Sequence, residues 1–192
     1  MQNSLKTKIP PGTYMNKLFY PIAAVLILAA SAFTFLSAPG WQITDGYSIS
    51  FTNDEASGIF KDFKGTLVFD EQNPGAGKFD VVIDVTSINT GNGLQNKHAK
   101  SDEWFDAAKY PQIHFVSRSM ARAGNGYQVT GDLDLHGVKK ALTIPFTFKR
   151  TAQGGVFTGS FTVNRSDFGI GKPGGEVPEP VKLDISVPVT KS

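Results

Sequence analysis

The chain has 192 residues, of which 11% are aromatic, 19% are charged and none is Cys. This length allows one domain with a sizeable apolar core, and the lack of Cys excludes disulfides, thiolate metal sites and a Cys nucleophile. The formal net charge of +2 is too small for the basic surface that phosphate backbones require, so we expect no nucleic-acid partner.

Residues 1–38 have the pattern of a leader segment. Three lysines precede an apolar run over residues 22–36, which contains the small-residue triplet Ala30-Ser31-Ala32. This pattern is typical of a secretory signal peptide, and we place cleavage after Ala32. Because the run approaches the length of a membrane-spanning helix, an uncleaved anchor is the alternative, and Met15 competes with Met1 as the start. Without those lysines, 16 basic residues face 17 acidic ones, a net charge of about −1.

The pattern from residue 39 to 192 indicates one antiparallel all-β domain. Apolar and polar residues alternate in about eight segments, as expected for strands with one buried and one solvated face. These segments are 47–52, 67–69, 79–86, 113–116, 127–136, 142–149, 157–164 and 181–190. Pro145 and Pro188 lie on the polar faces. Since Pro cannot donate a hydrogen bond to a ladder, each predicts a sheet edge or a bulge.

The segment from Gly91 to Pro111 interrupts the alternation. Leu94 and His98 have helical spacing, and Tyr110-Pro111 ends the segment, since Pro disfavours a helical conformation in the residue before it. We therefore expect a short helical plug between two halves of the sheet. Trp104 and Phe105 are adjacent, so on a regular helix or strand one would cap the cavity and the other would pack outward; at an irregular turn both would join the core.

Eight strands can close into a barrel that is either packed solid or wide enough for one slim ligand. Gly131 and Gly159 lie on the inner face of their strands. They favour a hollow barrel if they serve to remove side-chain volume, and a packed barrel or sandwich if they mark bends or bulges. The residue pattern alone leaves both possibilities open.

Three blocks of the sequence, in the order LQNKHAKSDEWFDAAKYPQIHF, GYQVTGDLDLHGVKKALTIPFTF and NRSDFGI, resemble the YceI-like family of polyisoprenoid-binding proteins. The resemblance covers nearly all of residues 41–189. It implies an exported, often periplasmic, lipocalin-like barrel that holds a long isoprenoid, such as a quinone tail or a polyprenyl phosphate. The chain departs from the family pattern at Tyr47, Gln95-Asn96 and Trp104, where many members have His, Arg-Asp and Phe. These differences bear on the headgroup rather than on the barrel.

We therefore predict a non-enzymatic barrel of the cell envelope that binds an isoprenoid for sequestration or transport. It would have no catalytic residues, no metal and no required cofactor, and any membrane association would come through the N-terminal apolar segment. The expected cavity-lining residues are Ile49, Phe51, Phe69, Val81, Ile83, Trp104, Phe105, Phe115, Leu133, Phe146, Phe161 and Leu183. The alternatives are a solid barrel that acts as an interaction module and an enzyme that uses His98 with a nearby carboxylate. The oligomeric state stays open.

Two polar residues have more than one possible role. His98 would make a polar contact near the barrel's opening or would be a structural residue on the plug. Arg165 could contact a phosphate or carbonyl headgroup through its planar fork, or could pair with Asp167 or a plug carboxylate and pin a loop over the barrel. We favour the structural role for Arg165, because a buried Arg usually has a partner within the protein.

Overall fold

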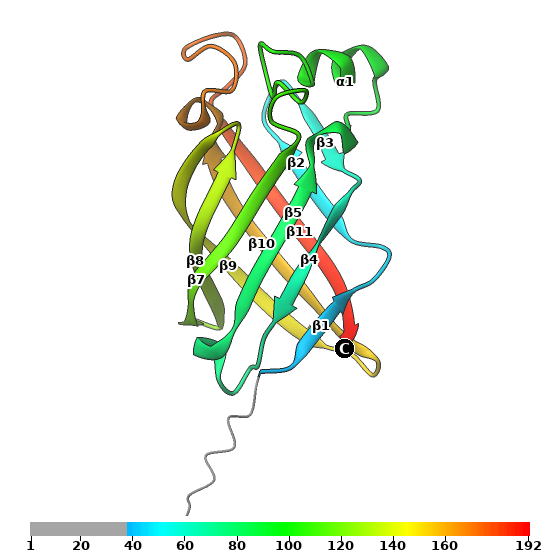
Figure 1. The fold of residues 1–192 in the computed structure, drawn as a ribbon, viewed down its shortest axis with the longest axis vertical. Coiled ribbons are helices and arrows are strands. Elements are labelled where there is room, and N and C mark those ends of the chain that lie inside the picture. Colours follow the sequence, from blue (N-terminus) through cyan, green and yellow to red (C-terminus); the bar gives the residue numbers. More distant parts are fainter. Residues whose placement is uncertain (1–37) are drawn as a thin grey trace, which may run out of the picture. The chain divides into compact units, whose positions relative to one another are not determined.

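The structure, a computed structural model, describes residues 38–192, so the predicted leader and its cleavage after Ala32 lie outside the described residues. Eight antiparallel strands form a closed barrel, because the last strand pairs with the first (Figure 1). In their order around the barrel they are β1 (Gly40–Ile43), β4 (Phe63–Val68), β5 (Lys78–Asp84), β7 (Gln112–Ala123), β8 (Gly126–Leu135), β9 (Val138–Arg150), β10 (Gly154–Asn164) and β11 (Pro180–Lys191). The predicted all-β barrel is confirmed.

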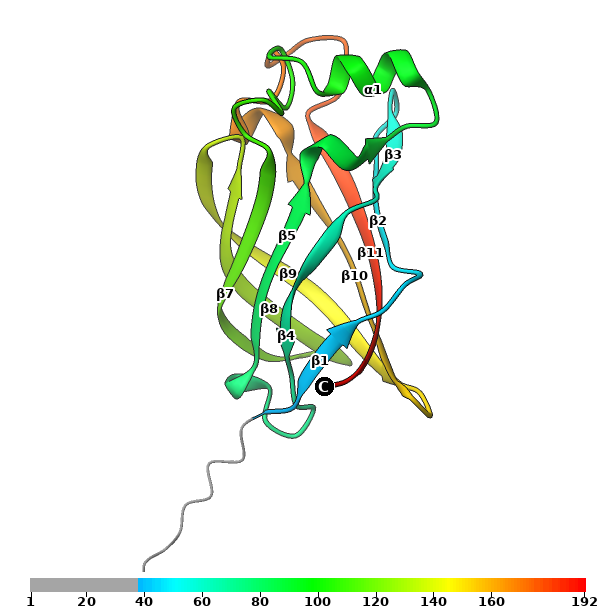
Figure 2. The ribbon, with the colours of Figure 1, turned by 45° about the vertical axis from the view of Figure 1, so that its right-hand side comes forward.

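The remaining strands continue three of these eight strands past short irregularities. β2 (Ser48–Thr52) pairs with β11, β3 (Ser57–Phe60) pairs with β2, and β6 (Ile88–Asn89) pairs with β3. β1 and β4 pair only through Gly40↔Val68 and Trp41↔Leu67. Beyond those pairs, β2, β3 and β6 continue β1, β4 and β5 in the same order around the barrel, and Figure 2 shows β2 and β3 at the end that carries α1. At this end β9 and β10 no longer pair beyond Phe146↔Gly159, so we call it the wide end and the opposite end the narrow end.

Both prolines in the strands lie where a ladder stops. β9 and β10 pair only from Phe146↔Gly159 to Gly155↔Arg150, so Pro145 is the first residue of β9 beyond that ladder. Pro188 lies between the part of β11 that pairs with β2 and the part that pairs with β1. Because a missing N–H costs nothing where no partner strand accepts it, the predicted edge positions are confirmed.

Aromatic rings fill the narrow end, which we call the closed end. Phe69 is 0% exposed, and its ring centroid lies 4.8 Å from that of Tyr127 and 5.5 Å from that of Phe146. The indole Nε1 of Trp41 donates to the Phe69 carbonyl over 2.9 Å. Buried rings in edge-to-face contact stabilise each other beyond their apolar area. This end of the barrel is a conventional packed core.

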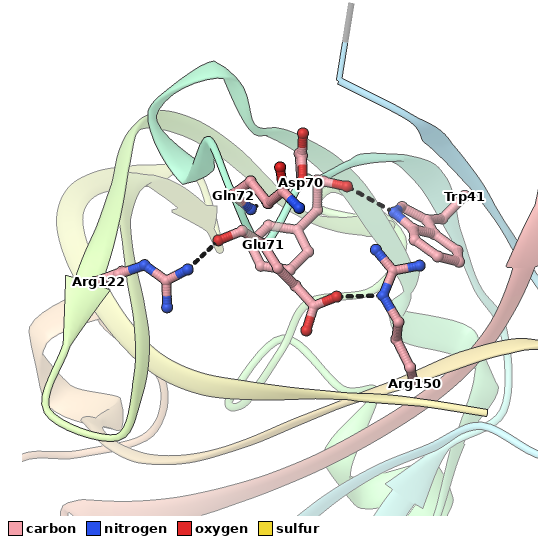
Figure 3. A network of polar contacts seen from close by, with 7 residues as sticks. Trp41, Asp70, Glu71, Gln72, Arg122 and Arg150 are labelled. Carbon is pink, nitrogen blue, oxygen red and sulfur yellow. Dashed lines mark hydrogen bonds and ion pairs between the residues drawn. The ribbon is translucent and has the colours of Figure 1, made fainter.

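An ion-pair cluster covers the closed end from outside (Figure 3). Glu71, in the connection between β4 and β5, accepts hydrogen bonds from Arg150 on its carboxylate and from Arg122 on its carbonyl. The guanidinium of Arg150 also lies over the ring of Trp41, 5.8 Å from its centroid. The loop that crosses the closed end is thus fastened to two different hairpins.

Gly131 and Gly159 mark close approaches of the backbone. A Cβ on Gly131 would lie 2.3 Å from the Val116 carbonyl oxygen, next to the register shift between Ser117 and Ser119. A Cβ on Gly159 would lie 3.0 Å from the Pro145 carbonyl oxygen, where the β9–β10 ladder ends. Gly131 is therefore required by the close backbone, and Gly159 lies at a tight contact that favours glycine, so both mark irregular strand geometry.

The wide end carries the helical segment. α1 (Gly93–Ala99) begins at Asn92, whose side-chain oxygen accepts from the amides of Leu94 and Gln95. Three short 3-10 helices complete the described elements: η1 (Pro74–Ala76), η2 (Val85–Ser87) and η3 (Arg165–Phe168). Within residues 38–192, none of the helices has the length and apolar character needed to cross a membrane.

Candidate functional site

The wide half of the barrel encloses an apolar cavity of about 670 Å³. This volume is within the range of about 300–1,000 Å³ that is usual for sites of small ligands. The cavity lies in the half of the barrel where the β9–β10 ladder has stopped, whereas aromatic side chains fill the narrow half. Its walls are the inward-facing positions of the strands, so the alternation that closes the barrel also makes the walls apolar.

Ten of the twelve expected lining residues border this cavity: Ile49, Phe51, Val81, Ile83, Trp104, Phe105, Phe115, Leu133, Phe161 and Leu183. Phe69 and Phe146 do not border it and belong to the aromatic core of the closed end. Alternation shows which face of a strand a residue occupies, but it does not show how far along the barrel axis the residue lies. That any of these side chains contacts a ligand stays a prediction.

Several lining residues were absent from the expected set. Leu142, Ile144 and Ile185 border the cavity and share the inner faces of their strands with predicted residues, so the alternation could have identified them. Phe60 and Phe63 also border it. They belong to short strands, β3 and β4, whose apolar residues are too few to produce a clear period of two.

The cavity opens at the wide end, between the β2–β3 turn, α1 and the loop of residues 171–178; we call this opening the mouth. Exposed residues from two of these elements, Glu55 and Leu94, border the cavity, which therefore reaches solvent here. Trp104 and Phe105 both border it as well. Of the two alternatives, the structure has the one in which both face the interior, because this segment is a series of irregular turns rather than a regular helix or strand.

His98 is held by the plug itself. Its Nε2 accepts a hydrogen bond of 2.7 Å from the Trp104 indole Nε1, and both residues border the cavity at the mouth. The neutral ring must carry its proton on Nδ1 for Nε2 to accept. In the described residues no carboxylate makes a hydrogen bond with His98, so the pairing required by the enzyme alternative is not seen.

Arg165 is buried, at 5% exposure, and its guanidinium is directed at main-chain carbonyls. Nε donates to the Pro178 carbonyl, Nη1 to that of Ile170, and Nη2 to those of Lys172 and Val177. The guanidinium also lies over the Trp104 ring, 5.4 Å from its centroid. Arg165 therefore holds the loop at the mouth and joins it to the plug.

The carboxylate partners expected for Arg165 are engaged elsewhere or are not bonded to it. Asp167 pairs instead with Lys140 over 2.9 Å. Glu179 accepts from Ser166 Oγ over 2.6 Å and from the Gly174 amide over 3.0 Å. These bonds, with the Ser166 bond as the largest cause and the Arg165 charge as a smaller one, lower the pKa of Glu179. The bonds from Arg165 and from Glu179 thus hold the loop of residues 171–178 from both sides.

The other two histidines lie outside the cavity. His114 pairs with Asp80 over 2.7 Å on the outer wall. The Nδ1 of His136, which has a positive φ in the β8–β9 turn, is 3.0 Å from the Phe168 carbonyl. The described part of the chain contains no group of three or more His, Cys, Asp or Glu residues that could hold a metal ion.

The fold and the cavity together define a lipocalin-like β-barrel with an internal apolar site. A family model described as the YceI-like domain matches residues 41–189, and the chain belongs to this family. Among its relatives, Protein YceI of Escherichia coli O157:H7 is 38% identical over 140 residues, which cover 68% of this chain and 71% of the relative. A UPF0312 protein of Pseudomonas syringae is 40% identical over 136 residues, covering 67% and 70%.

Solved structures of similar proteins share the barrel. BcnA of Burkholderia cenocepacia is 32% identical, with a TM-score of 0.69 over 75% of this chain and 96% of that one. The YceI protein of Campylobacter jejuni is 26% identical, with a TM-score of 0.64 over 73% and 87%. A polyisoprenoid binding domain from Saccharophagus degradans has a TM-score of 0.60 over 81% and 99%, but at 16% identity this likeness shows the fold alone.

Proposed function

We propose that this barrel binds a long-chain isoprenoid in its cavity and carries or sequesters it in the cell envelope, without catalysing a reaction and without a required cofactor. The observation that carries the proposal is the apolar cavity of about 670 Å³ that opens at one end of the barrel. Each CH₂ group that leaves water for such a cavity contributes about 0.8 kcal/mol. An isoprenoid tail would therefore be bound by desolvation, with its polar end at the mouth.

We infer further that the headgroup is uncharged, as in a quinone or an alcohol. Among the described residues, Glu55 and Arg165 are the only Asp, Glu, Lys or Arg side chains that border the cavity. The Arg165 fork is already bonded to four main-chain carbonyls, and Glu55 is an anion. A phosphate is best met by a free cation, and in the described residues no Lys borders this cavity and its one Arg is already engaged. A polyprenyl phosphate is therefore the less suitable of the two ligands that the family resemblance implies.

Native mass spectrometry of protein purified without added lipid tests the first proposal. We expect an adduct whose mass corresponds to an isoprenoid. A clean ligand-free mass, together with no binding of added isoprenoids, would contradict the carrier function.

A matched pair of ligands tests the headgroup. A polyprenol and its monophosphate have the same tail, so they differ only at the mouth. We expect the alcohol to bind at least about tenfold more tightly, because the phosphate would lose hydration without gaining a cation. Equal affinities, or tighter binding of the phosphate, would show that the mouth does recognise an anion.

The two alternative functions have weaker support. A solid interaction module requires a filled barrel, whereas the wide half of this barrel is hollow. An enzyme that uses His98 requires a carboxylate that orients the ring, and Trp104 occupies the Nε2 of His98 instead.

A further inference from the structure

Leu94 is the most exposed large apolar residue in the described part of the chain. It is 77% exposed, whereas the next two, Val116 and Ile59, are 38% and 37% exposed. Isolated exposed apolar residues are normal on protein surfaces. Leu94 differs from them by its place, because it borders the mouth and so continues the apolar wall of the cavity out into solvent.

The helix that carries Leu94 has no packing reason to present it. α1 contains no buried residue; its start is fixed by the Asn92 cap and the hydrogen bonds between the Asn96 side chain and Thr90, and its last residue, Ala99, packs against the core. A helix of seven residues is too short to be stable by its own propensity. These contacts hold the helix at the wide end of the barrel, where Figure 1 shows it, while Leu94 stays exposed.

We propose that the mouth docks transiently on a lipid bilayer, with Leu94 inserted among the lipids. This inference rests on the proposed function: a long isoprenoid dissolves in membranes rather than in water, so a carrier must receive it from a membrane or from another carrier. With the mouth against the bilayer, Leu94 connects the membrane interior to the cavity wall. The tail then passes between two apolar phases and avoids water.

The charges around the mouth indicate which kind of bilayer fits. Lys97 on α1 and Lys172 in the loop lie at the same end of the barrel as Asp54, Glu55 and Glu176. Anionic membranes attract clusters of four or more basic residues, and this rim carries both signs. The partner is therefore a bilayer of zwitterionic lipid, and the docking force is apolar.

A single inserted leucine can hold the protein on a membrane only briefly. Burying one leucine side chain changes a partition constant by roughly ten- to a hundredfold, whereas stable membrane anchoring requires two independent signals. Docking by Leu94 is therefore collisional, and it accelerates the transfer of lipid without holding the protein on the membrane.

The test compares the wild-type chain with Leu94→Glu in transfer of a fluorescent polyprenol from phosphatidylcholine vesicles. Glu is acceptable at this position because it favours the first turn of a helix, so the variant retains the fold. Val116→Gln, which removes the next most exposed apolar side chain from the outer wall, is the matched control. Affinity is measured separately, with the same polyprenol delivered from detergent.

For the wild-type chain we expect a transfer rate that rises with vesicle concentration. Leu94→Glu should lower that rate about tenfold or more, and by a larger factor than it lowers the affinity from detergent, whereas Val116→Gln should change neither. Adding anionic lipid to the vesicles should change the wild-type rate little. A rate that does not depend on vesicle concentration, or that is the same in Leu94→Glu, would overturn the proposal and favour a protein donor.

Flotation of ligand-free protein with phosphatidylcholine vesicles separates this inference from the proposed function. Vesicle binding that is weak in the wild-type chain and lost in Leu94→Glu supports docking even if no isoprenoid binds the cavity. Isoprenoid binding from detergent, with no vesicle binding above that of Leu94→Glu, overturns docking and leaves the carrier function in place.

Discussion

Replacing Arg165 by Ala separates a structural role of this side chain from recognition of a headgroup. The guanidinium makes four hydrogen bonds to carbonyls of residues 170–178 and lies over Trp104. Hydrogen bonds that involve a charged group contribute about 1.5–3 kcal/mol each but are not additive, and removal of a buried charged group from its partners costs about 3–5 kcal/mol. For a chain of this size that loss lowers Tm by roughly 10 °C.

Arg165→Lys is the informative control, because it keeps the charge and loses the planar fork. If the fork holds the loop, Lys cannot reach the same carbonyls, and Tm falls nearly as far as in the Ala variant. Thermal unfolding followed by circular dichroism gives Tm, and titration with a polyprenol and its monophosphate gives the ratio of the two affinities. We expect that ratio to stay unchanged in both variants. An unchanged Tm, combined with selective loss of phosphate binding in Arg165→Ala and its recovery in Arg165→Lys, would refute the structural role.

Three further changes test other parts of the barrel. Phe69→Ala should lower the free energy of unfolding by about 3–5 kcal/mol in denaturant titrations, because it empties the centre of the closed end; a loss below about 1 kcal/mol would show that this end is not a packed core. Val81→Trp should fill part of the cavity and lower isoprenoid affinity at least about tenfold with little change in Tm, and unchanged affinity would place the ligand elsewhere. The lowered pKa of Glu179 means that its carboxylate stabilises the loop above about pH 4.5, and that this contribution is lost as the pH falls through the lower pKa of the folded state. Ligand release should therefore accelerate under acid in the wild-type chain but not in Glu179→Gln; equal acceleration in both would exclude this carboxylate.

The sequence predicts the barrel well because short stretches of neighbouring residues are enough to identify a strand. Alternation along Tyr127–Leu135 identifies a strand and its inner face, and Pro145 and Pro188 locate the ends of ladders by the absence of an N–H. The pairing partners are not local, since they depend on contacts between segments far apart in the chain. The register shifts that divide three strands into β1 and β2, β3 and β4, and β5 and β6 were therefore missed, and so was the place of the cavity at one end.

The site is predicted less completely than the fold. Phe69 and Phe161 have the same pattern in the sequence, yet one belongs to the packed core and the other borders the cavity. Their difference is a position along the barrel axis, which follows from strand register. Arg165 was correctly suspected to be buried, but its partners are carbonyls. Every residue has a carbonyl, so no side chain in the sequence indicates such a partner.

The point at which the chain joins the barrel restricts how the protein can meet a membrane. The Pro39 carbonyl accepts from the Phe69 amide over 3.1 Å, so the start of the domain is fixed to the closed end. β9 has 13 residues, and at about 3.3 Å per residue and a tilt near 40° the mouth lies roughly 30 Å away along the axis. If the predicted leader stayed as an anchor, it would attach the domain to the membrane at the closed end, opposite the mouth. Under the proposed carrier function, the predicted cleavage after Ala32 would instead leave the domain free to turn its mouth toward the same bilayer.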